Sequence, residues 1–231
     1  MSVELIVFDL AGTTVKDNED VHRTMKNALS QHGVEISIND ANAVMGLPKP
    51  QAIRMLLDRR YHGGRPITED WIASIHDIFV RDMISFYKSD PSVGEMSGVN
   101  LTFRKLREHK LKVFVDTGFD RQITDPLIDR LGWKQENLID GSVTSDEVKR
   151  GRPFPDLIFR AMELTRTKNP GNVAKVGDTA SDMQEGIAAG CGWVIGITTG
   201  SNSRAELLRE KHTHLIEDVS EVLEILNINI D

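Results

Sequence analysis

Short apolar runs alternate with helical patterns along most of this chain. The apolar runs are ELIVF (4–8), LKVFVDT (111–117), LIDGSVT (138–144), VAKVGD (173–178) and WVIGIT (193–198). The helical patterns fall at 98–109, 120–131, 155–166, 180–190 and 203–211. Runs that are apolar at nearly every position are typical of strands buried on both faces. The order therefore predicts an α/β fold with a parallel sheet, whose ligands bind at the carboxyl ends of the strands.

A long segment between the first two runs has no strand pattern. Residues 16–90 contain several helical patterns, of which one ends near Gly33 and another follows Thr68, a residue suited to cap a helix. We expect these residues to form an all-helical cap domain. It would be inserted into a Rossmann-like core made of residues 1–15 and 91–231, with the return connection in the loop 88–95.

Composition excludes some classes of partner. The 231 residues carry a net charge of −7 and a pI near 5.5, which argues against nucleic acid or an anionic membrane as a partner. The single cysteine, Cys191, cannot form an internal disulfide, as expected for the cytoplasm. No pattern of a signal peptide or a membrane-spanning segment is found.

The first run delivers a carboxylate to its end. Asp9 follows ELIVF, and the chain then turns through Ala11 and Gly12 into Thr13. A carboxylate in this place can attack phosphorus and form an aspartyl-phosphate intermediate. Enzymes that hydrolyse phosphate esters in this way usually place a second Asp two residues later, as acid and base. Here that residue is Ala11, which has no proton to give.

A second group of carboxylates lies in VGDTASDMQEG (176–186). Asp178 ends a strand pattern and Asp182 falls in the first turn of the next helix, so both are expected near Asp9. Carboxylate and carbonyl oxygens suit Mg²⁺, which would reduce the repulsion between Asp9 and an anionic phosphoryl group. For Asp182, a simple role as a helix cap is the alternative.

Two further segments offer groups for a phosphoryl oxygen. Arg152 lies between Gly151 and Pro153, where its guanidinium can hold such an oxygen, and Lys149 is its competitor for this role. Thr117 and Gly118, after the second apolar run, add a hydroxyl and a backbone N–H.

These segments occur in the order DLAGTT, TG, GRP and GDTASD, and this order resembles the haloacid dehalogenase superfamily over essentially the whole chain. The resemblance is strongest to phosphonoacetaldehyde hydrolases, or phosphonatases. That subfamily also has Ala at the position of Ala11 and a cap motif Met-Gly-Leu-x-Lys, here residues 45–49.

The resemblance implies roles for individual residues. Lys49 would form a Schiff base with a substrate aldehyde, and Asp9, the Ala11 carbonyl and Asp178 would hold Mg²⁺. Thr117 and Arg152 would bind the phosphoryl group, with Asp182 as a further catalytic residue. Gly12, Thr13, Met45 and Gly118 would contact the substrate. The family often dimerises through the cap, which implies a homodimer here. A protonated imine on Lys49 would accept the electrons of a breaking C–P bond, so an acid at position 11 becomes dispensable.

Two positions depart from the phosphonatase pattern. Ala52 stands where these enzymes have a His three residues after the lysine, and Phe119 stands where they have a Tyr after Thr-Gly. His22 on the first cap helix is a candidate to replace them. Three functions stay open: a hydrolase of a small phosphonate, a small-metabolite phosphatase similar to phosphoglycolate phosphatases, and a non-catalytic binding module. We predict a Mg²⁺-dependent hydrolase acting on a small phosphono or phosphorylated compound.

Overall fold

A computed structural model describes residues 2–228 of the chain. Its centre is a six-stranded sheet in the order β3-β2-β1-β4-β5-β6, with every neighbouring pair parallel. The strands are β1 (Leu5–Asp9), β2 (Lys112–Thr117), β3 (Gly141–Thr144), β4 (Val173–Gly177), β5 (Trp193–Ile197) and β6 (His214–Ile216). The predicted α/β class with a parallel sheet is confirmed.

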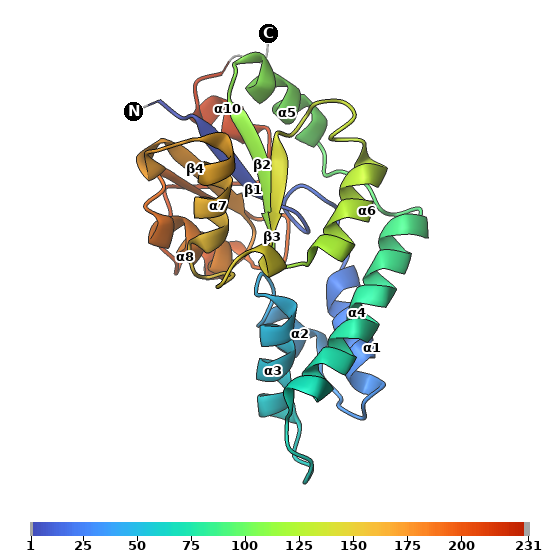
Figure 1. Ribbon diagram of the computed structural model, residues 1–231. Helices are drawn as coiled ribbons and strands as arrows, with labels where there is room; N and C mark the ends of the chain where they lie inside the picture. The colour runs from blue at the N-terminus through green and yellow to red at the C-terminus, as the bar shows by residue number, and fades with distance from the viewer. Residues whose placement is uncertain (1, 229–231) are drawn as a thin grey trace.

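Helices cover both faces of this sheet (Figure 1). They are α5 (Val99–Glu108), α6 (Arg121–Leu131), α7 (Asp156–Thr165), α8 (Ala180–Ala189), α9 (Arg204–Leu207), α10 (Glu221–Ile225) and the short 3₁₀ helices η1 (Ser145–Glu147) and η2 (Pro170–Asn172). Side chains alternate along β1, so Phe8 packs on Phe103 of α5 with ring centroids 5.0 Å apart, whereas Leu5 and Val7 join the apolar cluster around α7. Burial on both faces explains why this strand is apolar throughout.

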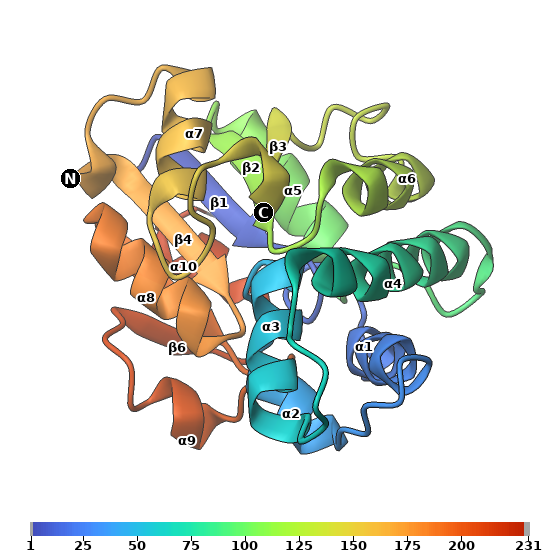
Figure 2. The same ribbon diagram turned by 60° about the horizontal axis from the view of Figure 1, so that its bottom comes forward.

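The segment formed by residues 16–90, which precedes α5, consists of helices and their connecting loops and lies together below the sheet in the view of Figure 1. Its helices are α1 (Asp20–Ser30), α2 (Ile38–Asn42), α3 (Lys49–Arg60) and α4 (Glu69–Ser89). The Thr68 hydroxyl accepts a hydrogen bond from the Trp71 N–H, as expected for a cap at the start of α4. Helix α4 packs on α1, on α3 and on α6, so it joins the helical segment to the sheet-flanking helices (Figure 2).

The strand order reverses between β1 and β4. From β1 the chain adds β2 and β3 on one side, and then β4, β5 and β6 on the other. The crevice at such a switch point is where open α/β sheets bind ligands. Asp9 is the last residue of β1 and Asp178 directly follows β4, so both carboxylates lie at this crevice.

Some boundaries differ from the sequence prediction. The helix expected at 203–211 is shorter than predicted. It is α9, which is capped by Ser203 and ends at Leu207. The run at 138–144 forms a strand only from Gly141, since Asp140 bonds to the Val113 backbone before the pairing begins. Between residues 2 and 228, no helix is long and apolar enough to cross a membrane.

Candidate active site

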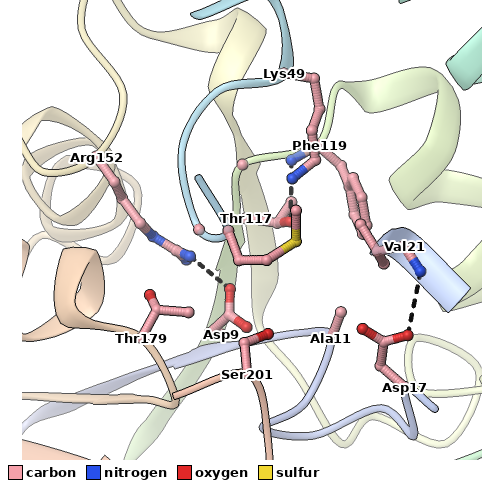
Figure 3. Close-up of a pocket in the computed structure, with 13 residues that line it drawn as sticks. Asp9, Ala11, Asp17, Val21, Lys49, Thr117, Phe119, Arg152, Thr179 and Ser201 are labelled. Atoms are coloured by element: carbon pink, nitrogen blue, oxygen red, sulfur yellow. Dashed lines mark hydrogen bonds and ion pairs between the residues drawn. The ribbon is translucent and has the colours of Figure 1, made fainter. Parts of the chain in front are cut away.

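A small pocket lies between the carboxyl ends of the strands and the helical segment. Its volume is about 30 Å³, enough for about one water molecule. Residues from both parts of the chain line it (Figure 3): Asp9, Ala11, Asp17, Val21, Met45, Gly46, Lys49, Thr117, Gly118, Phe119, Arg152, Thr179 and Ser201. Of the predicted site residues, seven therefore meet in one pocket: Asp9, Ala11, Met45, Lys49, Thr117, Gly118 and Arg152.

The side of the pocket formed by the sheet contains a dense set of buried charges. Arg152 is 1% exposed, and its Nη1 lies 2.6 Å from Asp9 Oδ1 and 3.0 Å from Asp182 Oδ1. Its Nε lies 3.1 Å from Glu185, and its Nη2 pairs with Asp116. These carboxylates outweigh the effect of burial and raise the pKa of Arg152 well above its usual value. The guanidinium is therefore fixed and permanently charged.

Lys175 lies in the same network and was not predicted. Its Nζ is 3.0 Å from Asp182 and 3.2 Å from Glu185, and it also pairs with Asp116. Burial raises the pKa of Glu185 to about 8, so this carboxyl is largely neutral at pH 7. Asp116 and Lys175 lie inside strands that are buried on both faces. An acidic residue in one such apolar run and a basic residue in another were the sequence signal that could have revealed this pair.

Asp182 caps a helix, as the alternative from the sequence has it, and it also contacts two buried cations. Its Oδ2 accepts a 3.1 Å hydrogen bond from the Thr179 N–H, which caps α8, while its Oδ1 faces Arg152 and Lys175. Despite the opposing effect of burial, the two cations lower the pKa of Asp182. Asp182 is fully buried and does not line the pocket, so it acts on the site through Arg152.

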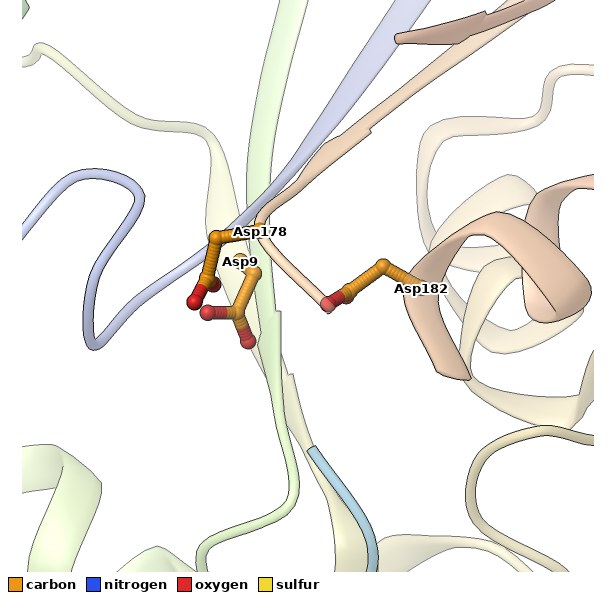
Figure 4. A group of neighbouring side chains, drawn as sticks. All are labelled: Asp9, Asp178 and Asp182. Carbon is orange, nitrogen blue, oxygen red and sulfur yellow. The ribbon is translucent and has the colours of Figure 1, made fainter. Parts of the chain in front are cut away.

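The carboxylates of Asp9 and Asp178 lie close together (Figure 4). Together with Asp182 they can place three carboxylate oxygens within 4.8 Å of one another. Burial raises the pKa of Asp9 to about 6, and burial and the charge of Asp9 raise the pKa of Asp178 well above its usual value. Two adjacent buried carboxylates of this kind fit a divalent metal, which would let both stay ionised.

Gly12 and Thr13 lie behind Asp178 and are not among the residues that line the pocket. The Thr13 hydroxyl donates a 2.9 Å hydrogen bond to Asp178 Oδ1, and the Ser201 N–H donates one of 2.6 Å to Oδ2. A Cβ atom on Gly12 would lie 2.7 Å from the same carboxylate, and its φ of +88° also favours glycine. These residues orient Asp178 rather than contact the pocket.

Lys49 approaches the pocket from the opposite side, as the first residue of α3. It is 3% exposed, and no described carboxylate forms an ion pair with it. Its Nζ lies 5.0 Å from the centroid of the Phe119 ring and 6.0 Å from that of Phe79. Burial lowers the pKa of Lys49 to about 8, because Asp9 only partly offsets the cost of desolvation. The amine can therefore be neutral in a useful fraction of molecules near neutral pH.

Two glycines of the core leave space for the loop that precedes Lys49. A Cβ atom on Gly118 would lie 2.6 Å from the Leu47 carbonyl oxygen, and one on Gly151 would collide with the Pro48 ring. Lys149 and Arg150 lie outside this contact, in a separate cavity beside Pro48. Of the three cations in this segment, Arg152 alone reaches the pocket.

A protein-family model for haloacid dehalogenase-like hydrolases matches residues 6–195. The chain belongs to the haloacid dehalogenase-like hydrolase family. It is an enzyme of the haloacid dehalogenase type, as its sequence motifs predicted.

This hydrolase is similar to several proteins of known name. It is 33% identical over 227 residues to a phosphonoacetaldehyde hydrolase of Bacteroides fragilis, covering 93% of this chain and 82% of that protein. It is 33% identical over 217 residues to the phosphonoacetaldehyde hydrolase of Bacillus cereus, covering 87% and 78%.

Solved structures share the fold at lower identity. A phosphonoacetaldehyde hydrolase like protein from Oleispira antarctica superposes with a TM-score of 0.82 at 21% identity, covering 98% of this chain and 92% of that one. A predicted phosphoglycolate phosphatase from Haemophilus somnus gives 0.78 at 20% identity, covering 97% and 98%. Members with different named activities therefore share this architecture.

Proposed function

We propose that this enzyme is a phosphonatase-like hydrolase that cleaves a C–P bond in a small phosphonate bearing an aldehyde. The observation that carries this proposal is Lys49, which is buried in the same pocket as Asp9 and has no ion-pair partner among residues 2–228. A neutral amine is needed to form an imine, and the desolvated surroundings of Lys49 favour the neutral form. The names of the relatives support the same substrate class.

The pocket provides a group for each part of the reaction. Asp9 would attack phosphorus, while the fixed Arg152 guanidinium and the Thr117 hydroxyl hold the phosphoryl oxygens. The electrons of the C–P bond would pass into the iminium on Lys49, and the leaving group departs as an enamine. Because carbon accepts these electrons, no acid is required at Ala11 for this step.

We further propose that Asp9, the Ala11 carbonyl and Asp178 hold Mg²⁺. When bound, the ion would neutralise the two carboxylates and draw the phosphoryl group toward Asp9. Chelation should abolish turnover, and Mg²⁺ should restore it. Persistent activity in excess chelator would contradict this assignment.

We also propose that residues 16–90 act as a cap over the core formed by 1–15 and 91–231. The 30 Å³ pocket supports this because a substrate much larger than water requires the helical segment to move before it can enter.

Borohydride trapping tests the proposed function. With phosphonoacetaldehyde present, borohydride should reduce the imine and leave a covalent adduct on Lys49, detectable by peptide mass spectrometry. Lys49→Arg should give no adduct and no turnover, because a guanidinium stays charged. Lys149→Arg is the matched control, since Lys149 lies outside the pocket and should keep its activity.

A phosphatase is the second candidate, and Phe119 favours it. An aromatic face 5.0 Å from the Lys49 Nζ stabilises the charged ammonium, which would bind an anionic substrate rather than an aldehyde. In that case phosphoglycolate or a sugar phosphate should be hydrolysed, borohydride should have no effect, and Lys49→Arg should keep much of the activity.

A further inference from the structure

A second carboxyl group lines the pocket, in addition to the nucleophile. Among the described lining residues, Asp9 and Asp17 are the two that carry a carboxyl group. Asp17 is close to Ala11 along the fold, because Ala11 forms a β-bridge with Val15, and both side chains line the pocket (Figure 3). Since Asp9 is used as the nucleophile, Asp17 is the carboxyl group left for proton transfer.

The two oxygens of Asp17 have different surroundings. Oδ1 accepts hydrogen bonds from the Asp20 N–H at 2.7 Å and the Val21 N–H at 3.2 Å, at the start of α1. Oδ2 accepts none of the described hydrogen bonds and lies 3.9 Å from His22 Nδ1. The backbone bonds therefore fix the carboxyl group, and Oδ2 is the oxygen available to carry a proton.

His22 is a buried histidine with one unpartnered nitrogen. Asn42 Oδ1 lies 3.1 Å from His22 Nε2, and this contact holds the ring in place. His22 is 4% exposed, and its Nδ1 has no hydrogen-bond partner in the part of the chain that the structure describes. Its Nδ1 therefore faces Asp17 Oδ2 at 3.9 Å, and neither atom has another described hydrogen-bond partner.

Other titratable groups surround this pair. They are Asp20 on the same helix, Lys49 on α3 and Tyr87 on α4. Burial raises the pKa of Asp17. This effect is larger than the opposing effects of the backbone hydrogen bonds and of His22, which lower the pKa.

We propose that Asp17, positioned by His22, donates the proton that lets oxygen depart when the imine forms on Lys49. This inference rests on the proposed function. Addition of the Lys49 amine to the aldehyde gives a carbinolamine, whose C–O bond then breaks. The oxygen leaves as water with the Asp17 proton, the nitrogen lone pair forms the C=N bond, and the carboxylate faces the new iminium cation. After C–P cleavage, a proton from solvent water adds to the enamine carbon and gives the product iminium. Water then adds to this iminium, and the proton it releases returns to Asp17.

Substitution of Asp17 by Asn isolates this step. The Asn side chain keeps an oxygen for the N–H groups of Asp20 and Val21 and is a good helix cap, but it has no acidic proton. We expect Asp17→Asn to slow borohydride trapping of phosphonoacetaldehyde on Lys49 by about 10²-fold, a usual contribution of acid catalysis. Asp82→Asn is the control, since Asp82 pairs with Arg81 at the surface, and its trapping rate should equal that of the wild type.

The outcomes separate this inference from the proposed function. If the wild type forms no adduct, the imine mechanism itself is overturned. If the wild type and Asp17→Asn form the adduct at the same rate, Asp17 is not the proton donor, and the imine mechanism stands. Thermal unfolding of both variants shows whether slow borohydride trapping comes only from loss of structure.

His22 is a positioning residue in this scheme and has its own test. His22→Gln keeps an amide near Asn42 but cannot share a proton with Asp17. We expect the part of the pH profile that reports loss of the Asp17 proton to move to a different pH in this variant. If the trapping rate is lower by the same factor at every pH, His22 contributes only through packing.

Discussion

The two sides of the pocket handle a buried cation in opposite ways. On the sheet side, Arg152 contacts four carboxylates and stays charged at any accessible pH. On the helical side, Lys49 has aromatic rings as neighbours and no described ion-pair partner, and burial lowers its pKa to about 8. The contrast shows how one pocket can keep a permanent charge for phosphoryl oxygens and an adjustable amine for a second reaction.

Asp9→Asn should have the largest effect, because it removes the proposed nucleophile on the sheet side. We expect turnover to fall by roughly 10⁴-fold or more, as it does when a covalent nucleophile is removed from other enzymes. Beryllium fluoride, which mimics a phosphoryl group on a carboxylate, should bind the wild type and not this variant. Near-native turnover in Asp9→Asn would show that the reaction is not covalent at Asp9.

Arg152→Lys should lower turnover by roughly 10²- to 10³-fold, a loss typical of one electrostatic donor. A lysine keeps the charge among the carboxylates but cannot contact Asp9, Asp116 and Glu185 at once. Arg150→Lys is the control, because Arg150 pairs with Asp156 at the surface. Equal losses in the two variants would mean that this segment contributes only diffuse charge.

Lys49→Met should stabilise the protein while it removes activity on an aldehyde. The folded-state pKa of about 8 lies below the usual 10.5, so burying the charged amine costs about 3 kcal/mol below pH 8. Between pH 8 and 10.5 the unfolded chain keeps a proton that the folded protein has lost, so wild-type stability rises with pH. Urea unfolding should therefore show the advantage of Met at pH 7 and little of it near pH 10.5. If the variant were less stable than the wild type at pH 7, the charged Lys49 amine would not be destabilising in the folded protein.

The smallest expected effect is the pH dependence of imine formation. Since only the neutral amine reacts, the rate of borohydride trapping on Lys49 should rise about fivefold from pH 7 to pH 8 and then level off, given a pKa of about 8. A flat rate between pH 7 and pH 9 would indicate that the amine is already neutral or never becomes so.

The sheet-side residues were the more predictable of the two groups. Asp9, Thr117 and Asp178 are at or just after strand ends, and a parallel sheet brings such ends together whatever the details of packing. The buried pairing of Asp116 with Lys175 was missed, because sequence periodicity indicates burial but not which charged residues meet. Strand β6 was missed because three residues are too short for a pattern.

The helical side was harder to predict from sequence. In the sequence, Asp17 lies shortly before a helical pattern. Its carboxylate accepts hydrogen bonds from the first N–H groups of α1. Its exposure to the pocket depends on how α1 packs on α4, which is a tertiary contact with no local signature. The support of Asp178 by Thr13 likewise depends on residues 165 positions apart in the chain.

The position of Asp9 and Lys49 on separate chain segments has a consequence for the order of events. In the proposed reaction the C–P bond breaks as the bond from Asp9 to phosphorus forms, so the phosphoryl group stays on β1 and the enamine stays on α3. Neither half can diffuse away while its bond persists, so both are retained by bonds rather than by affinity. Release of the aldehyde would then wait for hydrolysis at Lys49, and release of phosphate would wait for hydrolysis at Asp9.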